Sequence, residues 1–225
     1  MDAAVIQSKI YTGFAKAASY VGSSFSQYRP VAGQPPIGPA TLVGSINAAF
    51  TVATGDTFTF GRPGLKANFF YYCLADGAQI QVGDILTSLA GTYYIASMQP
   101  LEMPVAVLCN ALISFNRPAS APSTGLVAYQ GVSETTETQL AAGVAFPASV
   151  QLAASGRSTK SDALAGDSAG PLKYTVFFPS GSLVAPAWPI RERDVVYDNI
   201  ARRFQVAGYE ATPIGARLDT TRLMV

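Results

Sequence analysis

The sequence predicts a mainly β protein, with two small β-barrel or sandwich domains in tandem after an N-terminal amphipathic helix and an extended proline-rich arm. Three observations predict this class. From Leu42 onward, short apolar runs alternate with Gly, Asp and Pro, as in small all-β domains. One such block recurs about 110 residues later. The 225 residues also suffice for two domains of about 100 residues each.

The recurring block is the strongest of these observations. Residues 80–86 and 91–96 align without a gap on residues 190–196 and 201–206. Asp84 then falls on Asp194, and Tyr94 falls on Phe204. A proline and an aliphatic-rich tail follow each block, at residues 104–108 and 213–218, shifted by a single residue relative to the alignment of the blocks. A period this long indicates two copies of one fold rather than a solenoid, and it favours an assembly role over a single active site.

The first 40 residues are expected to form a helix and then an arm. Apolar side chains recur at steps of three and four, which predicts one stripe along a helix over residues 3–21: Val5, Ile6, Ile10, Phe14, Ala17 and Val21. Gly22 is placed to end this helix. The prolines and glycines of residues 30–39 oppose helix and strand alike, which predicts an extended arm. The stripe can pack on the chain's own barrel or in a groove of a neighbouring subunit.

The rest of the chain divides into two barrels and a connecting segment. Residues 41–118 are expected to form the first β-barrel, with strands at 57–60, 69–75, 85–88, 92–99 and 105–116. Residues 119–172 are expected to be linker and irregular structure, and the proline-rich run 117–125 reads as the interdomain linker itself. Residues 173–225 are expected to form the second barrel, with strands at 174–178, 194–198, 203–207 and 216–218.

The composition points to a protein that buries surface against other subunits. Hydrophobic residues make up 49% of the chain and charged residues 13%, about half the share usual in soluble domains. So few charges would leave a monomer's surface poorly covered. The net charge of +1 favours no particular partner. Neither a signal peptide nor a run of 18 apolar residues is found, so we expect synthesis in a cytoplasm without membrane insertion.

One segment invites a catalytic interpretation. Residues 166–172 are close to the Gly-Asp-Ser-Gly-Gly-Pro-Leu around the nucleophile of chymotrypsin-like proteases, which would make Ser168 the nucleophile. Those enzymes need an imidazole to move the serine proton, and this chain contains no histidine. A dyad with Lys160 or Lys173 stays open, so a serine hydrolase is the alternative from a different class. A turn before a strand is the simpler interpretation.

The remaining candidate groups have structural interpretations. Asp84 and Asp194 each precede an apolar pair, so we expect their side chains to bond backbone amides at the start of a strand rather than to act as an acid and a base. Cys73 and Cys109 lie in expected strands and should be buried, unreactive thiols. Without histidine, Cys-x-x-Cys or an acidic ligand cluster, no metal or cofactor is expected.

The doubled pattern resembles a known class of virion protein. Residues 190–218 contain an Asp-Val-Val-Tyr-Asp segment, then Arg-Arg-Phe-Gln-Val, then a closing aliphatic strand. This run resembles the small β-barrel of head–tail joining proteins of tailed bacteriophages, the stopper or head-completion proteins, and residues 83–95 resemble it too. The wider order is similar to phage virion proteins: a helix ending in Tyr28-Arg29-Pro30, a barrel ending in Asn116-Arg117-Pro118, residues 146–150, and a second barrel.

The resemblance implies a non-enzymatic structural component of the virion, assembled in the host cytoplasm. It would form a symmetric ring of identical subunits at the head–tail neck or in the tail, next to a portal, adaptor or tail-tube protein, with DNA passing through the lumen unread. The alternatives are a tail hub or baseplate protein and a capsid decoration protein. The expected subunit-interface residues are Ile6, Ile10, Phe14, Tyr28, Arg29 and Pro30. The expected channel-facing residues are Arg191, Arg193, Arg202 and Arg203.

Overall fold

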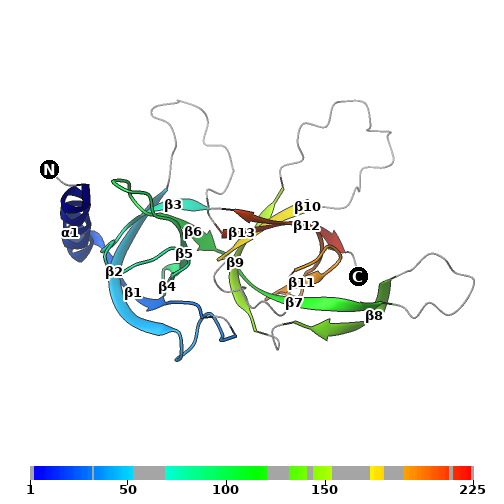
Figure 1. Ribbon diagram of the computed structural model, residues 1–225. Helices are drawn as coiled ribbons and strands as arrows, with labels where there is room; N and C mark the ends of the chain where they lie inside the picture. The colour runs from blue at the N-terminus through cyan, green and yellow to red at the C-terminus, as the bar shows by residue number, and fades with distance from the viewer. Residues whose placement is uncertain are drawn as a thin grey trace, which may run out of the picture.

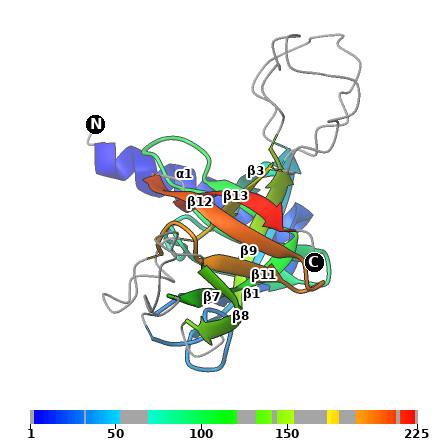
Figure 2. The same cartoon turned by 90° about the vertical axis from the view of Figure 1, so that its right-hand side faces the viewer.

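The described residues form one helix and two β-barrels arranged in a row (Figure 1), and Figure 2 looks along this row with the second barrel in front. The computed structural model describes residues 3–31, 33–52, 69–120, 132–140, 144–153, 173–179, 190–212 and 215–223. Helix α1 (Ala3–Val21) lies against the outer side of the first barrel, and the second barrel lies on the opposite side of the first. The predicted class, mainly β with two barrels in tandem and an N-terminal helix, is confirmed.

The first barrel is closed and antiparallel. Its strands lie in the order β1-β2-β3-β6-β5-β4, and β1 closes the barrel by pairing with β4. Their bounds are β1 (Ser23–Tyr28), β2 (Leu42–Val52), β3 (Phe70–Leu74), β4 (Ile85–Ser88), β5 (Gly91–Ser97) and β6 (Val105–Cys109).

The second barrel repeats this plan. The order β11-β12-β13-β10-β9-β7 is closed by pairing of β7 with β11, and β8 is added outside the closed barrel, on β7. The bounds are β7 (Ala111–Ser120), β8 (Val132–Gln139), β9 (Phe146–Leu152), β10 (Lys173–Phe178), β11 (Val195–Asp198), β12 (Arg203–Thr212) and β13 (Gly215–Leu223).

The two barrels share strand register as well as strand order. Every pairing between neighbouring strands of the first barrel has a counterpart in the second, and a β-bulge follows Ile95 in β5 and Val206 in β12 alike. Equivalent core positions, first barrel before second, are Phe25 and Ile113, Ile46 and Phe146, Tyr71 and Tyr174, Leu86 and Val196, Tyr93 and Phe204, and Ile95 and Val206. The duplication predicted from one block therefore extends to all six strands.

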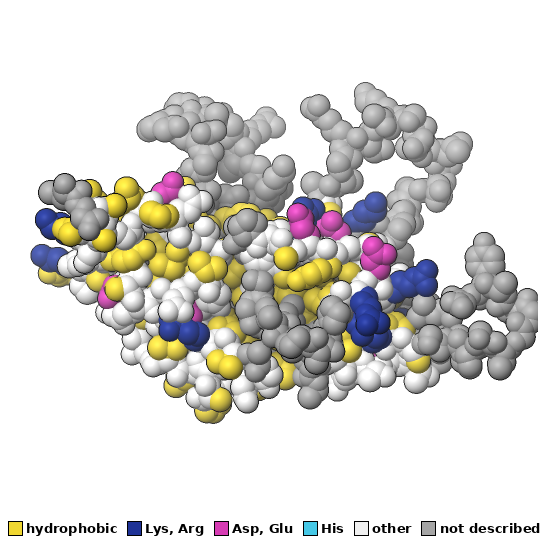
Figure 3. Space-filling view, in the orientation of Figure 1, with side chains coloured by type: hydrophobic (Ala, Val, Ile, Leu, Met, Phe, Trp, Pro, Cys, Tyr) yellow, Lys and Arg dark blue, Asp and Glu magenta, His cyan; other side chains and the backbone are white. Residues whose placement is uncertain are grey.

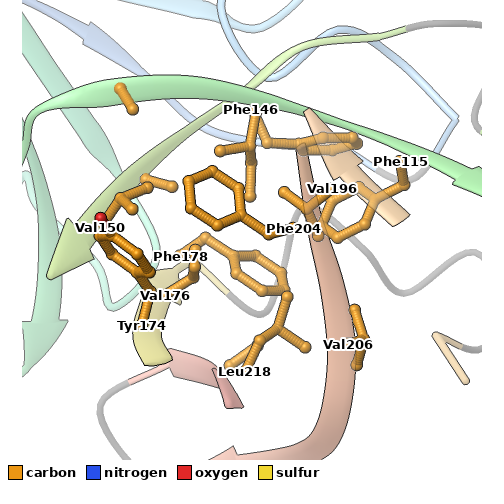
Figure 4. Packing of buried hydrophobic residues seen from close by; sticks show 14 of the residues in the cluster. Phe115, Phe146, Val150, Tyr174, Val176, Phe178, Val196, Phe204, Val206 and Leu218 are labelled. Carbon is orange, nitrogen blue, oxygen red and sulfur yellow. The ribbon is translucent and has the colours of Figure 1, made fainter. Parts of the chain in front are cut away.

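The cores of the two copies conserve volume by exchanging residues between paired strands. Phe25 in β1 faces Ile46 in β2, whereas their counterparts Ile113 and Phe146 hold the aromatic ring on the other strand. All four side chains are buried. Such exchanges keep the total volume nearly constant, and cores tolerate them well. Figure 4 shows the aromatic packing of the second core.

The gapless alignment is wrong by one residue after the β4–β5 turn. β4 pairs Leu86 with Tyr93, and β11 pairs Val196 with Phe204, so Phe204 corresponds to Tyr93 and not to Tyr94. The turn of the second copy is one residue longer, with Ala201 in a left-handed conformation at φ 61°. Once this insertion is allowed, residues 80–97 and 190–208 form equivalent strand pairs.

The alignment of the aliphatic tails, residues 104–108 with 213–218, is wrong by more than one residue. Ala106 pairs with Ile95 and Thr220 pairs with Val206, so Ala106 corresponds to Thr220 and not to a residue of the 213–218 run. The cause is hairpin length. β12 and β13 stay paired as far as Thr212 and Gly215, whereas β5 ends at Ser97 and β6 begins only at Val105.

The barrels are joined directly at Asn110, and residues 117–120 of the expected linker belong to strand β7, while residues 121–125 lie outside the described residues. β6 ends at Cys109 and β7 begins at Ala111. Asn110 between them donates from its backbone to Ala148 O (3.0 Å), and its side-chain amide exchanges two hydrogen bonds with Val150. The expected boundaries also differ, because β1 belongs to the first barrel and β7 and β9 to the second. Pro118 is accommodated because it lies beyond Asn116, where the pairing of β7 with β11 ends.

The contact between the barrels buries the outer face of the first. Tyr93 and Ile95 point into the first barrel, and the alternate residues Tyr94 and Ala96 point outward, yet all four are buried. On the second barrel Phe177 stacks on Phe69 with ring centroids 5.4 Å apart. The corresponding outer face of the second barrel is polar and more exposed, with Lys173, Gln205 and Thr221. The first barrel is therefore enclosed between α1 and the second barrel.

The predicted arm is a closed loop, and Tyr28 belongs to β1. Arg29 N donates to Thr41 O (2.8 Å), which brings the two ends of the loop together. The buried Thr41 hydroxyl lies 3.1–3.2 Å from the carbonyl oxygens of Pro35, Pro36 and Gly38. The prolines exclude helix and strand as expected, but a compact turn satisfies the backbone equally well.

Helix α1 packs on its own barrel, which resolves the alternative left open by the sequence. Tyr11 lies so close to Gly77 that a Cβ there would meet Tyr11 Cδ1 at 2.3 Å, and Gln7 Oε1 accepts a hydrogen bond from Leu101 N (2.6 Å). The side chain of Ala18 on this helix is buried against the barrel. Ile6, Ile10 and Phe14 are half-buried, and Val21 is 69% exposed.

Candidate functional site

In each barrel an arginine at the end of the first strand holds a buried aspartate: Arg29 directly follows β1, and Arg117 lies in β7. In the first barrel Arg29 Nε and Nη2 donate to Asp84 Oδ1 and Oδ2, both at 2.8 Å. In the second, Arg117 makes the same pair of bonds to Asp194, at 2.8 and 2.9 Å. Hydrogen bonding to the carboxylates raises the pKa of both guanidinium groups. We call these bidentate pairs the Arg–Asp clamps.

The clamps close the barrels at a turn that both copies share. Asp84 Oδ2 accepts from Gln81 N (2.9 Å) and Asp194 Oδ2 accepts from Arg191 N (2.8 Å). The backbone nitrogens of Gly83 and Arg193 donate to Ile95 O in β5 and to Val206 O in β12, both at 2.8 Å. The prediction that these aspartates bond backbone amides at strand entry is confirmed. Each carboxylate is occupied by its own arginine, which does not support an acid–base pair.

A non-glycine residue occupies the left-handed position of this turn in the second copy. Gly83 has φ 92° and its counterpart Arg193 has φ 75°. No atom lies within 4 Å of the place where a Cβ on Gly83 would stand, so the cost of a side chain there is that of the backbone alone. That cost is about 1 kcal/mol for an L-residue.

Because of this difference, substitutions at the two positions should change the stability of the fold in opposite directions. Gly83→Ala should lower the free energy of unfolding by about 1 kcal/mol, whereas Arg193→Gly should leave it unchanged or raise it slightly. Chemical denaturation of both variants beside the wild type measures the two changes. A loss of stability in Arg193→Gly would show that the arginine side chain itself stabilises the fold.

A second charged cluster lies where β8 meets the barrel. Glu137 of β8 accepts hydrogen bonds from Asn116 Nδ2 (3.1 Å) and Tyr197 Oη (2.9 Å), and it forms an ion pair with Arg203. The side chains of Glu137 and Arg203 are 11% and 14% exposed. Burial acts to raise the pKa of Glu137, but the three hydrogen bonds and the arginine outweigh it, and the pKa is lowered.

This cluster predicts a pH-dependent contribution to stability. A carboxyl whose pKa is lower in the folded protein stabilises the fold above its unfolded pKa, near 4.5, and loses that contribution as the pH falls through the folded pKa. Glu137→Gln should therefore cost about 2 kcal/mol at pH 7 and progressively less below pH 4.5. Urea titrations from pH 7 to 3 measure the difference. A constant difference across that range would contradict the assignment.

A cleft opens beside the second clamp. It has a volume of about 600 Å³, and we call it the arginine-rimmed cleft. It is lined by Arg117, Pro118, Ala119, Thr138, Leu140, Arg191, Glu192, Arg193 and Asp194. Figure 3 shows Lys and Arg side chains gathered at the right, over the second barrel.

The four expected channel-facing arginines do not share one role. Arg203 is bound to Glu137, and Arg202 Nε donates to Asp198 Oδ2 (2.6 Å) while its guanidinium lies 5.5 Å from the centroid of the Phe204 ring. Both are held by the barrel. Arg191 and Arg193 are exposed and line the cleft.

The expected interface residues also separate into two groups. Ile6, Ile10 and Phe14 lie half-buried on α1, whose other contacts are described above. Tyr28, Arg29 and Pro30 lie at the end of β1, where Arg29 forms the first clamp. The sequence did not identify the clamp arginines, although the dipeptide Arg-Pro recurs at residues 29–30 and 117–118 and was the signal available.

The other candidate residues are placed as follows. Ser168, Lys160 and the expected strand 57–60 lie outside the described residues, and Lys173 is exposed on β10. Cys73 is fully buried and Cys109 is half-buried; both are free thiols, and burial raises the pKa of Cys73 to about 12 and raises that of Cys109 as well. Within the described ranges no three His, Cys, Asp or Glu side chains are grouped as metal ligands would be.

Comparison with known proteins identifies no relative. A scan against protein-family models, a search of curated proteins and a search of solved structures each find no match. Among the helices of the described residues, none has both the length and the apolar character needed to cross a membrane.

Proposed function

We propose that this chain is a structural building block of a tailed-phage particle, forming a symmetric ring at the neck or in the tail around the path of the DNA. The observation that supports it best is the duplication of a closed barrel with its register intact. Two copies of one barrel give each subunit two similarly arranged sets of strand turns, although their outer faces differ, so that a ring of few chains can present twice as many turns of one geometry to its neighbours. The resemblance of residues 83–95 and 190–218 to joining proteins points to the same role.

The packing of the barrels favours binding of partners at the outer surface over binding of a ligand inside a barrel. Aromatic and aliphatic side chains fill both barrels, as Figure 4 shows for the second. Contacts with partners must then use loops and outer faces. The β4–β5 and β11–β12 turns both carry an exposed aliphatic residue, Leu89 (109%) and Ile200 (65%). Turns usually carry polar residues, so a repeated aliphatic at this position suits subunit contact.

Quantitative mass spectrometry of purified particles tests the proposal. A neck or tail ring predicts about a dozen copies or fewer per particle, whereas a decoration protein predicts hundreds. Absence of the chain from particles made in a host that expresses it would contradict the proposal. Electron microscopy with a gold-labelled antibody would separate the neck from the hub. Label at the vertex of the head that carries the tail indicates the neck, and label on the tail indicates the hub.

A further inference from the structure

The arginine-rimmed cleft combines two features that together suit a ligand. Pro118, Ala119 and Leu140 supply apolar walls, and the clamp of Arg117 and Asp194 forms part of its lining. β8, which supplies Thr138 to the lining, pairs with β7 and with no other strand of the described residues. It is therefore an edge strand among the described strands.

The charges of the rim are not needed to close the barrel. Arg191 uses its backbone N–H, not its side chain, to hold Asp194. Neither Arg191 nor Arg193 forms an ion pair with any side chain in the described part of the chain, in contrast to Arg117, Arg202 and Arg203. Two exposed guanidinium groups at one cleft are available to bind an anion.

The first barrel serves as an internal control for this site. Its corresponding turn reads Gln81-Val82-Gly83 and carries no charge, although the clamp beneath it has the same geometry. The fold thus needs neither rim arginine. Arg193 moreover occupies its left-handed conformation at a cost that glycine avoids in the first copy. A residue that is unfavourable for folding and exposed at a cleft is better explained by binding.

We infer that the arginine-rimmed cleft binds an extended acidic peptide segment of a neighbouring protein, with side-chain carboxylates on Arg191 and Arg193. A guanidinium group binds a carboxylate through two parallel hydrogen bonds. A peptide is favoured over nucleic acid because Pro118, Ala119 and Leu140 give the cleft apolar walls, which suit side chains better than a phosphate backbone. The inference rests on the proposed function only in taking the segment to belong to another particle protein.

Titration of the isotope-labelled chain by NMR tests the inference. The probe is an acetylated, amidated peptide of alternating threonine and glutamate, and the matched peptide replaces glutamate with glutamine. We expect shifts at residues 191–194 and 138 with the glutamate peptide, and binding at least about tenfold weaker with the glutamine peptide. Binding should also weaken as salt is raised.

The variant Arg191→Gln/Arg193→Gly gives the second arm, because it replaces both rim arginines by their counterparts in the first barrel, Gln81 and Gly83. We expect it to keep the wild-type melting temperature and to bind the glutamate peptide about tenfold more weakly or worse. Equal affinity in the variant, shifts elsewhere, or no binding by the wild type would each overturn the inference. Tighter binding of a short DNA duplex at this rim would overturn it in favour of a phosphate site. None of these outcomes changes whether the chain assembles, so the proposed function is tested separately.

Discussion

Asp84→Ala is expected to lower the free energy of unfolding by about 3 kcal/mol, the larger of the two clamp effects. Asp84 is 1% exposed and accepts bonds from Arg29, from Gln81 N and from the amide of Gln27, whose Nε2 lies 2.7 Å away. Removing the carboxylate leaves the Gln81 N–H and part of Gln27 without their partner. Arg29 is 37% exposed in its side chain, so water compensates for some of its loss.

The second clamp supplies the matched comparison. The counterpart of Gln27 is Phe115, which makes no side-chain hydrogen bond to Asp194, so Asp194→Ala should cost about 1 kcal/mol less than Asp84→Ala. Asp219→Ala serves as the surface control, because its side chain is 57% exposed, and its expected cost is below about 0.5 kcal/mol. Urea denaturation measures all three. A loss in Asp84→Ala no larger than in Asp219→Ala would show that the clamp does not stabilise the barrel.

Phe204→Ala is expected to lower the free energy of unfolding by about 4 kcal/mol. Phe204 is fully buried and meets the Tyr174 ring edge-on at 5.0 Å between centroids, and Arg202 covers its face. Its position among the aromatic rings of the second core is visible in Figure 4. Truncation leaves a cavity that a closed barrel cannot collapse to fill, because both neighbouring strands are fixed by pairing.

Tyr209→Ala on the same strand is the control for Phe204→Ala. Tyr209 is 47% exposed, so its truncation should cost less than about 1 kcal/mol. Both free energies of unfolding are measured by urea denaturation, and the comparison is valid if the m-value is the same in the two variants. An equal loss of stability in the two variants would mean that the second core is not packed as described.

The repeat made the architecture predictable, because a closed barrel depends on alternating apolar residues that survive in both copies. The buried pairs Leu86 with Val196 and Tyr93 with Phe204 carry this pattern. The exact register after each turn was not predictable, since a single inserted residue at Ala201 shifts the alignment without altering the apolar pattern visibly. In a strand such a shift moves every side chain to the other face.

The domain boundaries could not be predicted from the sequence for a different reason. Pro118 suggested a linker, yet proline is compatible with a strand beyond the point where its N–H would be needed. Likewise the loop of residues 30–41 and an extended arm have the same composition, and the contact of Arg29 N with Thr41 O that distinguishes them is not local. The clamps join residues 55 and 77 positions apart, so only the recurrence of Arg-Pro could have suggested them.

The enclosure of the first barrel bears on how subunits could meet. Its two broad faces are covered within the chain, by α1 and by the second barrel. Further subunits would then contact the turns at Leu89 and Ile200, the exposed side of α1, or the arginine-rimmed cleft. These surfaces carry both apolar and charged groups, as interfaces between separately folded proteins commonly do.

Native mass spectrometry of the purified chain at micromolar concentration tests whether the doubled barrel is an assembly unit. We expect one discrete closed oligomer at an integral multiple of the 23.5 kDa subunit mass, without an open-ended series of higher masses. A 23.5 kDa monomer at every concentration, from a chain that is also absent from purified particles, would contradict it.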